Sequence, residues 1–119
     1  MSWHFRHYKN SLNDGIYVTT INRVKISFDP LKDQSNQCKH GVSLALAREI
    51  DWQGVMAKPD TRQDYGEVRE IGYAVIAERL YCVVFTRRRD GMRIISLRKA
   101  NLREVQRYVE FTDPDRSDA

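Results

Sequence analysis

The sequence predicts one α+β domain in which helices pack on a mostly antiparallel sheet. The first observation is residues 80–100, where two apolar, β-rich arms flank a charged loop that contains Asp90-Gly91, the pattern of a β-hairpin. Two helix start signals precede this hairpin, and an amphipathic helix pattern follows it. With 119 residues, the chain has the size of a single domain with a modest core.

The hairpin concentrates positive charge. Its first arm, 80–86, is apolar on both faces, which is typical of a central strand. Strict alternation in the second arm puts Met92, Ile94, Ser96 and Arg98 on one face, and Arg93, Ile95, Leu97 and Lys99 on the other. Between Arg87 and Arg103 there are seven Arg or Lys residues and one acid, whereas the whole chain carries a net charge of only +4. This local charge favours a polyanion or an acidic protein as partner.

Before the hairpin, a short strand at 24–28 leads into a helix that begins at Asp29-Pro30 and ends at Gly41. Asp is a good N-cap, Pro suits the first helical position, and glycine often follows the last turn. One side of this helix carries a polar stripe, consisting of Lys32, Asn36, Lys39 and His40. Spacing alone favours a solvated helix face with a basic last turn, and a functional site is the alternative.

A second N-terminal helix is expected from Ser43 to about Asp51, with Leu44, Ala47 and Ile50 as its buried side. Strands are expected at 55–58 and 68–76, separated by a turn-rich, mobile stretch at 59–66.

Asn101 can cap the C-terminal helix. Its apolar repeat comprises Leu102, Val105, Tyr108 and Val109. The acidic tail 112–119 is expected to be disordered, and 1–23 is expected to be an extension with a short strand at 16–21.

The remaining chemistry of the sequence points to no metal and no cofactor. Cys38 and Cys82 are expected to act as small apolar side chains in a helix and a strand, and no disulfide framework or zinc spacing is present. His4 and His7 have no neighbouring Cys or carboxylate with which to form a metal site. Because no apolar run is long enough to span a bilayer, we expect a cytoplasmic protein without a membrane partner.

Several short motifs lie along residues 24–108. They are Phe28-Asp29-Pro30, Lys39-His40-Gly41-Val42, Tyr65-Gly66-Glu67, Ile71-Gly72, Val83-Val84-Phe85-Thr86, Arg93-Ile94-Ile95-Ser96 and Arg98-Lys99-Ala100, with Lys32, Asn36, Arg69, Arg88, Glu104 and Tyr108 between and after them. Together these motifs resemble the BrnT toxin family. Two departures are visible: Leu97 stands where the family usually has Ala, and 1–23 lies outside the family pattern. The toxin domain is therefore expected at 24–111.

The resemblance implies a RelE-like ribonuclease fold and a bacterial type II toxin that inhibits translation by cleaving RNA. It also implies a BrnA-type antitoxin, a ribbon-helix-helix DNA-binding protein, and binding of operator DNA only through the complex. A toxin dimer within a heterotetramer is compatible with such a pair.

A metal-independent endoribonuclease must stabilise charge on the phosphate and move protons at the 2′- and 5′-oxygens. Arg98 and Arg88 are the first candidates for the phosphate, because Arg binds two of its oxygens at once. His40 is the acid–base candidate, since imidazole titrates near neutrality, and Glu67 and Tyr108 are alternatives. The expected RNA-binding cations are Lys32, Lys39, Arg93 and Lys99.

Each of these residues also has a purely structural interpretation. His40 can serve as a helix C-terminal cation, Glu67 and Glu104 can form weak surface ion pairs, and Tyr108 can pack its ring under the sheet. The alternative function is therefore a non-catalytic basic module that binds an acidic protein or nucleic acid. Turnover of RNA separates the two hypotheses, because both would bind polyanions with a steep salt dependence.

Overall fold

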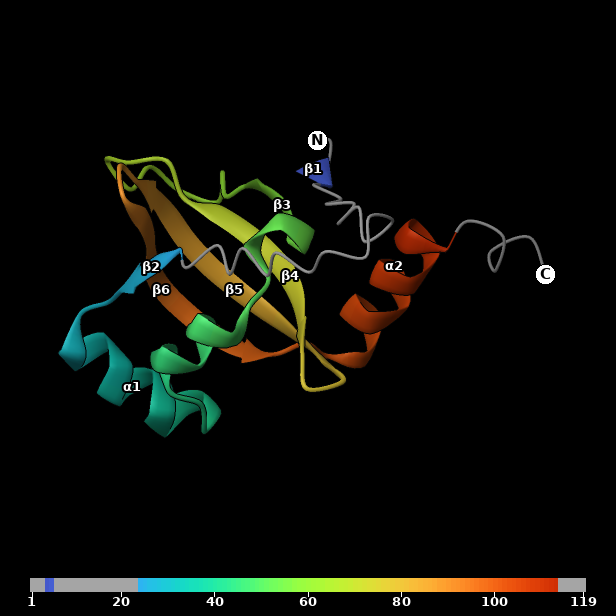
Figure 1. Ribbon diagram of the computed structural model, residues 1–119, viewed down its shortest axis with the longest axis horizontal. Coiled ribbons are helices and arrows are strands. Elements are labelled where there is room, and N and C mark those ends of the chain that lie inside the picture. Colours follow the sequence, from blue (N-terminus) through green and yellow to red (C-terminus); the bar gives the residue numbers. More distant parts are fainter. Residues whose placement is uncertain (1–3, 6–23, 114–119) are drawn as a thin grey trace, which may run out of the picture.

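The computed structural model describes residues 4–5 and 24–113. Six strands form one sheet in the order β1-β3-β4-β5-β6-β2 (Figure 1). The strands are β1 (His4–Phe5), β2 (Lys25–Ser27), β3 (Met56–Pro59), β4 (Glu70–Ile76), β5 (Arg79–Arg88) and β6 (Gly91–Lys99). Every pair in this described sheet is antiparallel except β2 with β6. The expected α+β class with a mostly antiparallel sheet is confirmed, while the expected strand at 16–21 and residue His7 lie outside the described residues.

The helices are α1 (Pro30–His40), the 3₁₀ helices η2 (Leu44–Glu49) and η3 (Trp52–Gly54), and α2 (Leu102–Thr112). Figure 1 shows α1 near β2 and β6 at one side of the sheet and α2 at the opposite side. The expected start of α1 is confirmed, because the Asp29 side chain accepts a hydrogen bond from the Leu31 amide and Pro30 opens the helix. Its end is confirmed as well, since Gly41 has a φ of 69°, which glycine adopts readily.

The prediction of an α-helix over 43–51 is wrong, because this segment forms the 3₁₀ helix η2, and η3 follows it. The expected buried residues are nevertheless correct: Leu44, Ala47 and Ile50 all lie in the core. Their spacing of three residues matches the 3.0 residues per turn of a 3₁₀ helix, so this geometry keeps all three on one line toward the sheet. The backbone of Ile50 closes the segment with a hydrogen bond to the Ala47 carbonyl oxygen.

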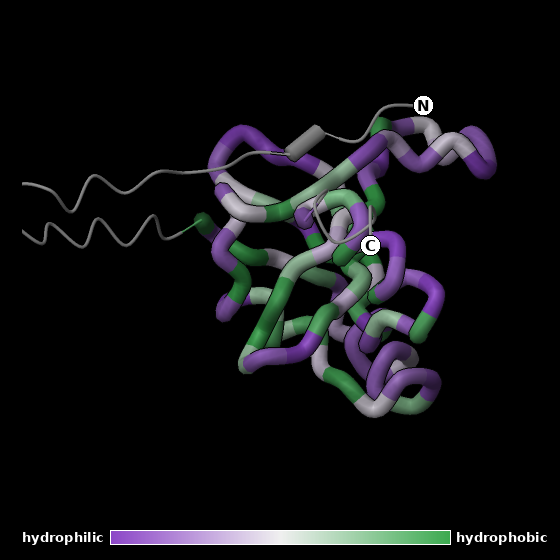
Figure 2. The backbone as a smooth tube through the Cα atoms, turned by 90° about the vertical axis from the view of Figure 1, so that its right-hand side faces the viewer, coloured by the Kyte–Doolittle hydropathy of each residue, from purple (hydrophilic) through white to green (hydrophobic). Residues whose placement is uncertain are grey.

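The core lies on one face of the sheet, under η2 and η3. Val83 and Phe85 from β5 are fully buried there, as expected for a central strand, and Trp52 packs edge-on against Phe85 with ring centroids 4.9 Å apart. On the other face, α2 has no fully buried residue, and Leu102 is 73% exposed. Figure 2 shows the hydrophobic colouring concentrated in the strands of the sheet. The two faces of the sheet are therefore covered unequally.

A β-bulge in β6 overturns the expected strict alternation of its side chains. Val84 pairs with Ser96 but Phe85 pairs with Ile94, so Ile95 is an extra residue in the ladder. As a result Ile94 and Leu97 both point into the core, although they are three residues apart. The same shift brings Arg93 onto the face that carries Arg98, whereas strict alternation separates the two.

Glycine is needed at position 91 because β2 and β6 approach closely there, and not because the turn requires a special backbone conformation. Its φ is not positive, but a Cβ at this position would lie 1.9 Å from the carbonyl oxygen of Lys25 in β2. Gly91→Ala is therefore expected to separate β2 from β6 and to lower the free energy of unfolding by about 2 kcal/mol, measured by urea denaturation. Gly54→Ala is the control, because its Cβ would meet only a carboxylate oxygen at 3.8 Å. Equal stability of the two variants would contradict the prediction.

Candidate functional site

Three arginines of the hairpin stand on one face of the sheet, opposite the core. Arg93 pairs with Thr86 and Arg98 pairs with Cys82, while Arg88 lies two residues beyond Thr86 on β5. Because alternate residues of a strand share a face, these pairings place the three arginines in a row along the face that α2 partly covers, with Arg93 between Arg98 and Arg88. We call Arg88, Arg93, Ser96 and Arg98 the arginine face. The bulge at Ile95 adds Arg93 to this face.

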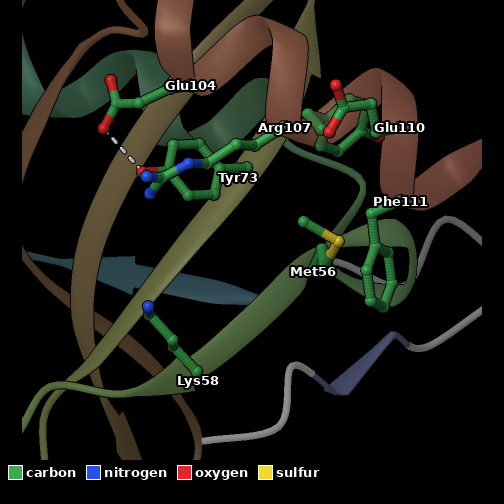
Figure 3. Close-up of a pocket in the computed structure, with 8 residues that line it drawn as sticks. Met56, Lys58, Tyr73, Glu104, Arg107, Glu110 and Phe111 are labelled. Atoms are coloured by element: carbon green, nitrogen blue, oxygen red, sulfur yellow. Dashed lines mark hydrogen bonds between the residues drawn. The ribbon is translucent and has the colours of Figure 1, made fainter. Parts of the chain in front are cut away.

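Arg98 is held in place by a carboxylate of α2. Its two terminal nitrogens donate to the two oxygens of Glu104 at 2.7 and 2.9 Å, in a bidentate pair. Tyr73 of β4 donates its hydroxyl hydrogen to the same carboxylate at 2.6 Å (Figure 3). Glu104 also accepts from the Asn101 amide, which completes the capping box that starts α2. One carboxylate thus orients Arg98 and anchors the C-terminal helix.

These contacts change the acidity of the groups involved. The hydrogen bonds from Arg98 outweigh burial and lower the pKa of Glu104 to about 2. Burial, followed by the hydrogen bond to Glu104, raises the pKa of Tyr73 well above its usual range. The side chain of Glu104 is only 15% exposed, so the interpretation of Glu104 as a weak surface pair is wrong. Glu104 is ionised and Tyr73 is protonated throughout the physiological range.

The Glu104 pair predicts a specific acid sensitivity. Because the pKa of Glu104 falls from 4.5 to about 2 on folding, its stabilisation is complete above pH 4.5 and is lost as pH falls toward 2. We expect Glu104→Gln to lower the free energy of unfolding by about 2 kcal/mol at pH 7 and to flatten its decline between pH 4.5 and 2. Urea denaturation across this range measures both effects. Glu49→Gln, at an exposed position, is the control and is expected to keep the parent profile.

One residue of the polar stripe of α1, Asn36, faces β6, so the interpretation as a solvated helix face is wrong for Asn36 and holds for Lys32, Lys39 and His40. Asn36 is buried between the helix and the strand, and its side-chain nitrogen donates to the carbonyl oxygens of Val42 and Leu97 at 2.8 and 2.7 Å. Its side-chain oxygen accepts from the Leu97 amide at 3.1 Å. Strand β6 pairs with β2 only as far as Arg93. Beyond that residue, Asn36 takes the place of a neighbouring strand by hydrogen-bonding the backbone of Leu97.

The rest of this stripe borders a cavity of about 310 Å³ beside the arginine face. Its lining residues from α1 include Lys32, Lys39 and His40, and Ser96 of the arginine face lines its opposite wall. The three α1 side chains are exposed to solvent. The structure thus brings the predicted histidine and two predicted lysines next to the strand that carries Arg93 and Arg98. Cys38 of α1 is exposed and does not act as a buried apolar side chain, whereas Cys82 is buried as expected.

Glu67 joins two arginines at the hairpin end of the arginine face. It lies 3.2 Å from Arg88 and 3.8 Å from Arg69, whose guanidinium group lies 4.2 Å from the centre of the Tyr65 ring. Arg88 and Glu67 retain 47% and 31% side-chain exposure, so this pair is accessible to a ligand. Glu67 can hold Arg88 in place, or it can act on a bound substrate itself.

Asp60 organises the turn-rich segment that leads to Glu67. Its buried carboxylate accepts hydrogen bonds from the Arg62 side chain at 2.8 Å and from the Tyr65 hydroxyl at 3.0 Å. The hydrogen bonds from Arg62 lower the pKa of Asp60 to about 2. This network fixes Tyr65, on which Arg69 stacks. The segment expected to be mobile therefore contains an internal hydrogen-bond network that supports Glu67.

Two predicted residues lie away from the arginine face. Lys99 pairs with Tyr81 and follows Arg98 directly in β6, so it points to the other face of the sheet. Tyr108 is half-buried on α2, and burial raises its pKa. It lines a second cavity, of about 420 Å³, together with Tyr73 and Glu104 (Figure 3). The structure brings Tyr108 near the Arg98 pair but not Lys99.

The sequence assigned no function to Tyr73, and it named Asn36 as part of the polar stripe and of the family pattern without a structural role. Both contribute uncharged hydrogen-bonding groups, which carry no signal in a charge pattern. Only the pairing of Tyr73 with Cys82, and of Cys82 with Arg98, reveals that Tyr73 stands two strands away from the arginine. Among the described residues, no group of three or more His, Cys, Asp or Glu is placed to hold a metal ion, and no helix is long and apolar enough to cross a membrane.

Residues 28–104 match the family model described as the ribonuclease toxin, BrnT, of type II toxin–antitoxin systems. No curated protein matches the chain. The matched range begins before α1 and ends at Glu104, so it includes the arginine face, the polar stripe of α1 and the carboxylate that holds Arg98.

Proposed function

Because the chain belongs to the BrnT family of type II ribonuclease toxins, we propose that it cleaves RNA on the arginine face, as a metal-independent endoribonuclease that inhibits translation. One observation supports this location: the bulge at Ile95 puts Arg93 on the same face as Arg98 and Arg88, beside the cavity lined by Lys32, Lys39 and His40. A phosphate chain needs several fixed cations, and catalysis needs a group that titrates near neutrality. We assign the toxin domain to 24–111 and its fold to the RelE-like type.

Arg98 binds the scissile phosphate in this proposal, and Arg88, which lies six residues along β5 from the partner of Arg98, binds another phosphate of the same RNA. An arginine has five N–H donors, and Arg98 makes three hydrogen bonds with described residues, to Lys99 and Glu104. Two donors are left for phosphate oxygens, and the bidentate contact with Glu104 keeps the guanidinium group oriented before the substrate arrives. Preorganised charge of this kind stabilises the negative charge that develops on the phosphorane-like transition state. Arg93, Lys32 and Lys39 bind neighbouring phosphates.

His40 accepts the proton of the 2′-hydroxyl, whose oxygen then attacks the adjacent phosphorus and expels the 5′-oxygen. The leaving oxygen must be protonated, and Tyr108 is the candidate donor because burial keeps it in the protonated form. Glu67 is the alternative base at the opposite end of the arginine face. The contribution of acid–base catalysis is expected to be about 10²–10⁴-fold.

The partner in this proposal is a BrnA-type antitoxin with a ribbon-helix-helix domain. Type II systems pair a toxin with a protein antitoxin, so an acidic segment of the partner can cover the arginine face and exclude RNA from it. Operator DNA would then be bound by the complex and not by the toxin alone. We place the complex in the bacterial cytoplasm.

Purified, antitoxin-free protein incubated with total RNA in EDTA tests this function. The parent is expected to cleave RNA, and His40→Ala is expected to slow cleavage about 10²-fold or more. Gln34→Ala, an exposed substitution on the same helix, is the control for α1 and is expected to keep the parent rate. Intact RNA with the parent, together with salt-sensitive RNA binding, would favour the non-catalytic module.

A further inference from the structure

We propose that the cavity between α2 and strands β3 and β4 binds one unpaired base of the RNA substrate, next to the phosphate on Arg98. The proposal rests on RNA cleavage at the arginine face and assigns a base-binding subsite to it. The cavity of about 420 Å³ falls in the size range of small-ligand sites. Figure 3 shows residues of α2 along one wall and residues of β3 and β4 along the other.

Aromatic rings and a methionine side chain line part of this cavity. Tyr73 lies at the end near Glu104, and Phe111 and Met56 lie at the other end (Figure 3). Phe111 is 47% exposed, so its ring is accessible to a ligand. Unpaired RNA bases are commonly stacked on aromatic rings or on arginine side chains, and Arg107 also lines the cavity.

The charges of the cavity favour a base over a phosphate. Lys58 and Arg107 contribute two positive charges, and Glu104 and Glu110 contribute two negative ones. A phosphate would meet two carboxylates here, whereas on the arginine face Arg98 alone has two donors left for it. A neutral base with hydrogen-bond donors and acceptors on its edges fits a charge-balanced wall, because it can pair with both signs.

Glu104 connects this cavity to the arginine face. Its carboxylate lines the cavity and at the same time accepts both hydrogen bonds from Arg98. A phosphate bound on the free donors of Arg98 is therefore separated from the cavity by a single carboxylate. The base of a nucleotide is joined to its phosphate through one sugar, so one nucleotide can contact both sites.

A protein segment fits the cavity less well than a base. A docking helix requires a continuous apolar groove that accepts residues at positions i, i+3, i+4 and i+7. The apolar positions here, Met56 and Phe111, are bordered by Lys58, Arg107 and Glu110. The space suits one planar group with polar edges.

The experiment measures equilibrium binding of short 2′-O-methyl RNA, which has no free 2′-hydroxyl and cannot be cleaved by the proposed mechanism. One base at a time is replaced by an abasic residue, which keeps every phosphate. With the parent protein, an abasic residue at one position is expected to raise the dissociation constant about tenfold, which is the scale of one stacked base. Both dissociation constants are expected to rise with salt. The ratio of the abasic to the intact dissociation constant is expected to stay the same, because the two ligands carry equal charge.

Two double variants supply the contrast. Arg107→Ala/Phe111→Ala removes two sides of the cavity and is expected to bring the ratio of abasic to intact dissociation constants close to one. Leu102→Ala/Arg103→Ala removes the same types of side chain from exposed positions of α2 outside the cavity, and is expected to keep the tenfold ratio. A ratio near one for the parent, or an unchanged ratio for the cavity variant, would overturn the proposal.

A third outcome would also overturn the proposal. If the abasic ratio of the parent is near one and the cavity variant no longer binds the antitoxin, the cavity is a protein-docking surface. Cleavage of total RNA by the parent is measured in a separate assay. If the parent cleaves RNA but shows no abasic effect, the base subsite is wrong and the ribonuclease assignment stands.

Discussion

Replacing Arg98 by alanine is expected to lower kcat/KM for RNA cleavage by about 10²–10³-fold, the scale of losing one preorganised charged donor in a transition state. Arg98 is the only arginine of the arginine face held by a bidentate carboxylate contact within the described residues. Its substitution removes the phosphate contact and leaves Glu104 without its cation. Cleavage of a defined RNA by purified protein, followed over time, measures the effect.

Two further variants separate catalysis from stability in this prediction. Arg98→Lys keeps the charge but loses the bidentate geometry, and is expected to recover only part of the rate. Arg103→Ala removes an exposed arginine of the same helix and is expected to lower kcat/KM less than threefold. The side chain of Arg103 forms no ion pair with Glu104 and does not line the cavity between α2 and strands β3 and β4. If folded Arg98→Ala protein, verified by its unfolding curve, cleaved RNA at the parent rate, Arg98 would have no part in the reaction.

Replacing Asn36 by alanine is expected to lower the free energy of unfolding by about 3 kcal/mol and the melting temperature by about 10 °C. The reason is the loss of three buried hydrogen bonds, which leaves the Val42 carbonyl and both backbone groups of Leu97 unpaired. Because Asn36 joins α1 to β6 just beyond the bulge, we also expect weaker RNA binding by the cavity that carries Lys39 and His40. Calorimetry and RNA titration measure the two effects.

Gln34→Ala is the matched control for Asn36→Ala. Gln34 lies on the same helix but is exposed, so its substitution is expected to change stability by less than about 0.5 kcal/mol. Asn36→Asp retains the acceptor for the Leu97 amide but turns a second oxygen toward two carbonyl oxygens, and is expected to be as destabilising as alanine. Stability equal to the parent in both Asn36 variants would show that the hydrogen bonds to β6 carry little free energy.

Local signals in the sequence were sufficient for most helix ends and for the hairpin. Asp29-Pro30 and Gly41 bound α1, and Asn101 with Glu104 starts α2, because capping depends on residues only a few positions apart. The hairpin arms are confirmed for the same reason. Local periodicity could not distinguish a 3₁₀ helix from an α-helix at Leu44–Glu49, since buried residues three apart suit both.

The family and the basic character of the site were also evident in the sequence, because motifs and charge are properties of residue order. The tertiary structure alone decided how the site is arranged. Pairing of β5 with β6 determined the bulge that unites Arg93 with Arg98, and pairing of β4 with β5 brought Tyr73 to Glu104. Packing of α1 turned Asn36 of the polar stripe inward, because its side chain offers both the donor and the acceptor that the edge of β6 requires. These contacts join residues 31 and 61 positions apart, and their free energy depends on the folded geometry, which no local pattern encodes.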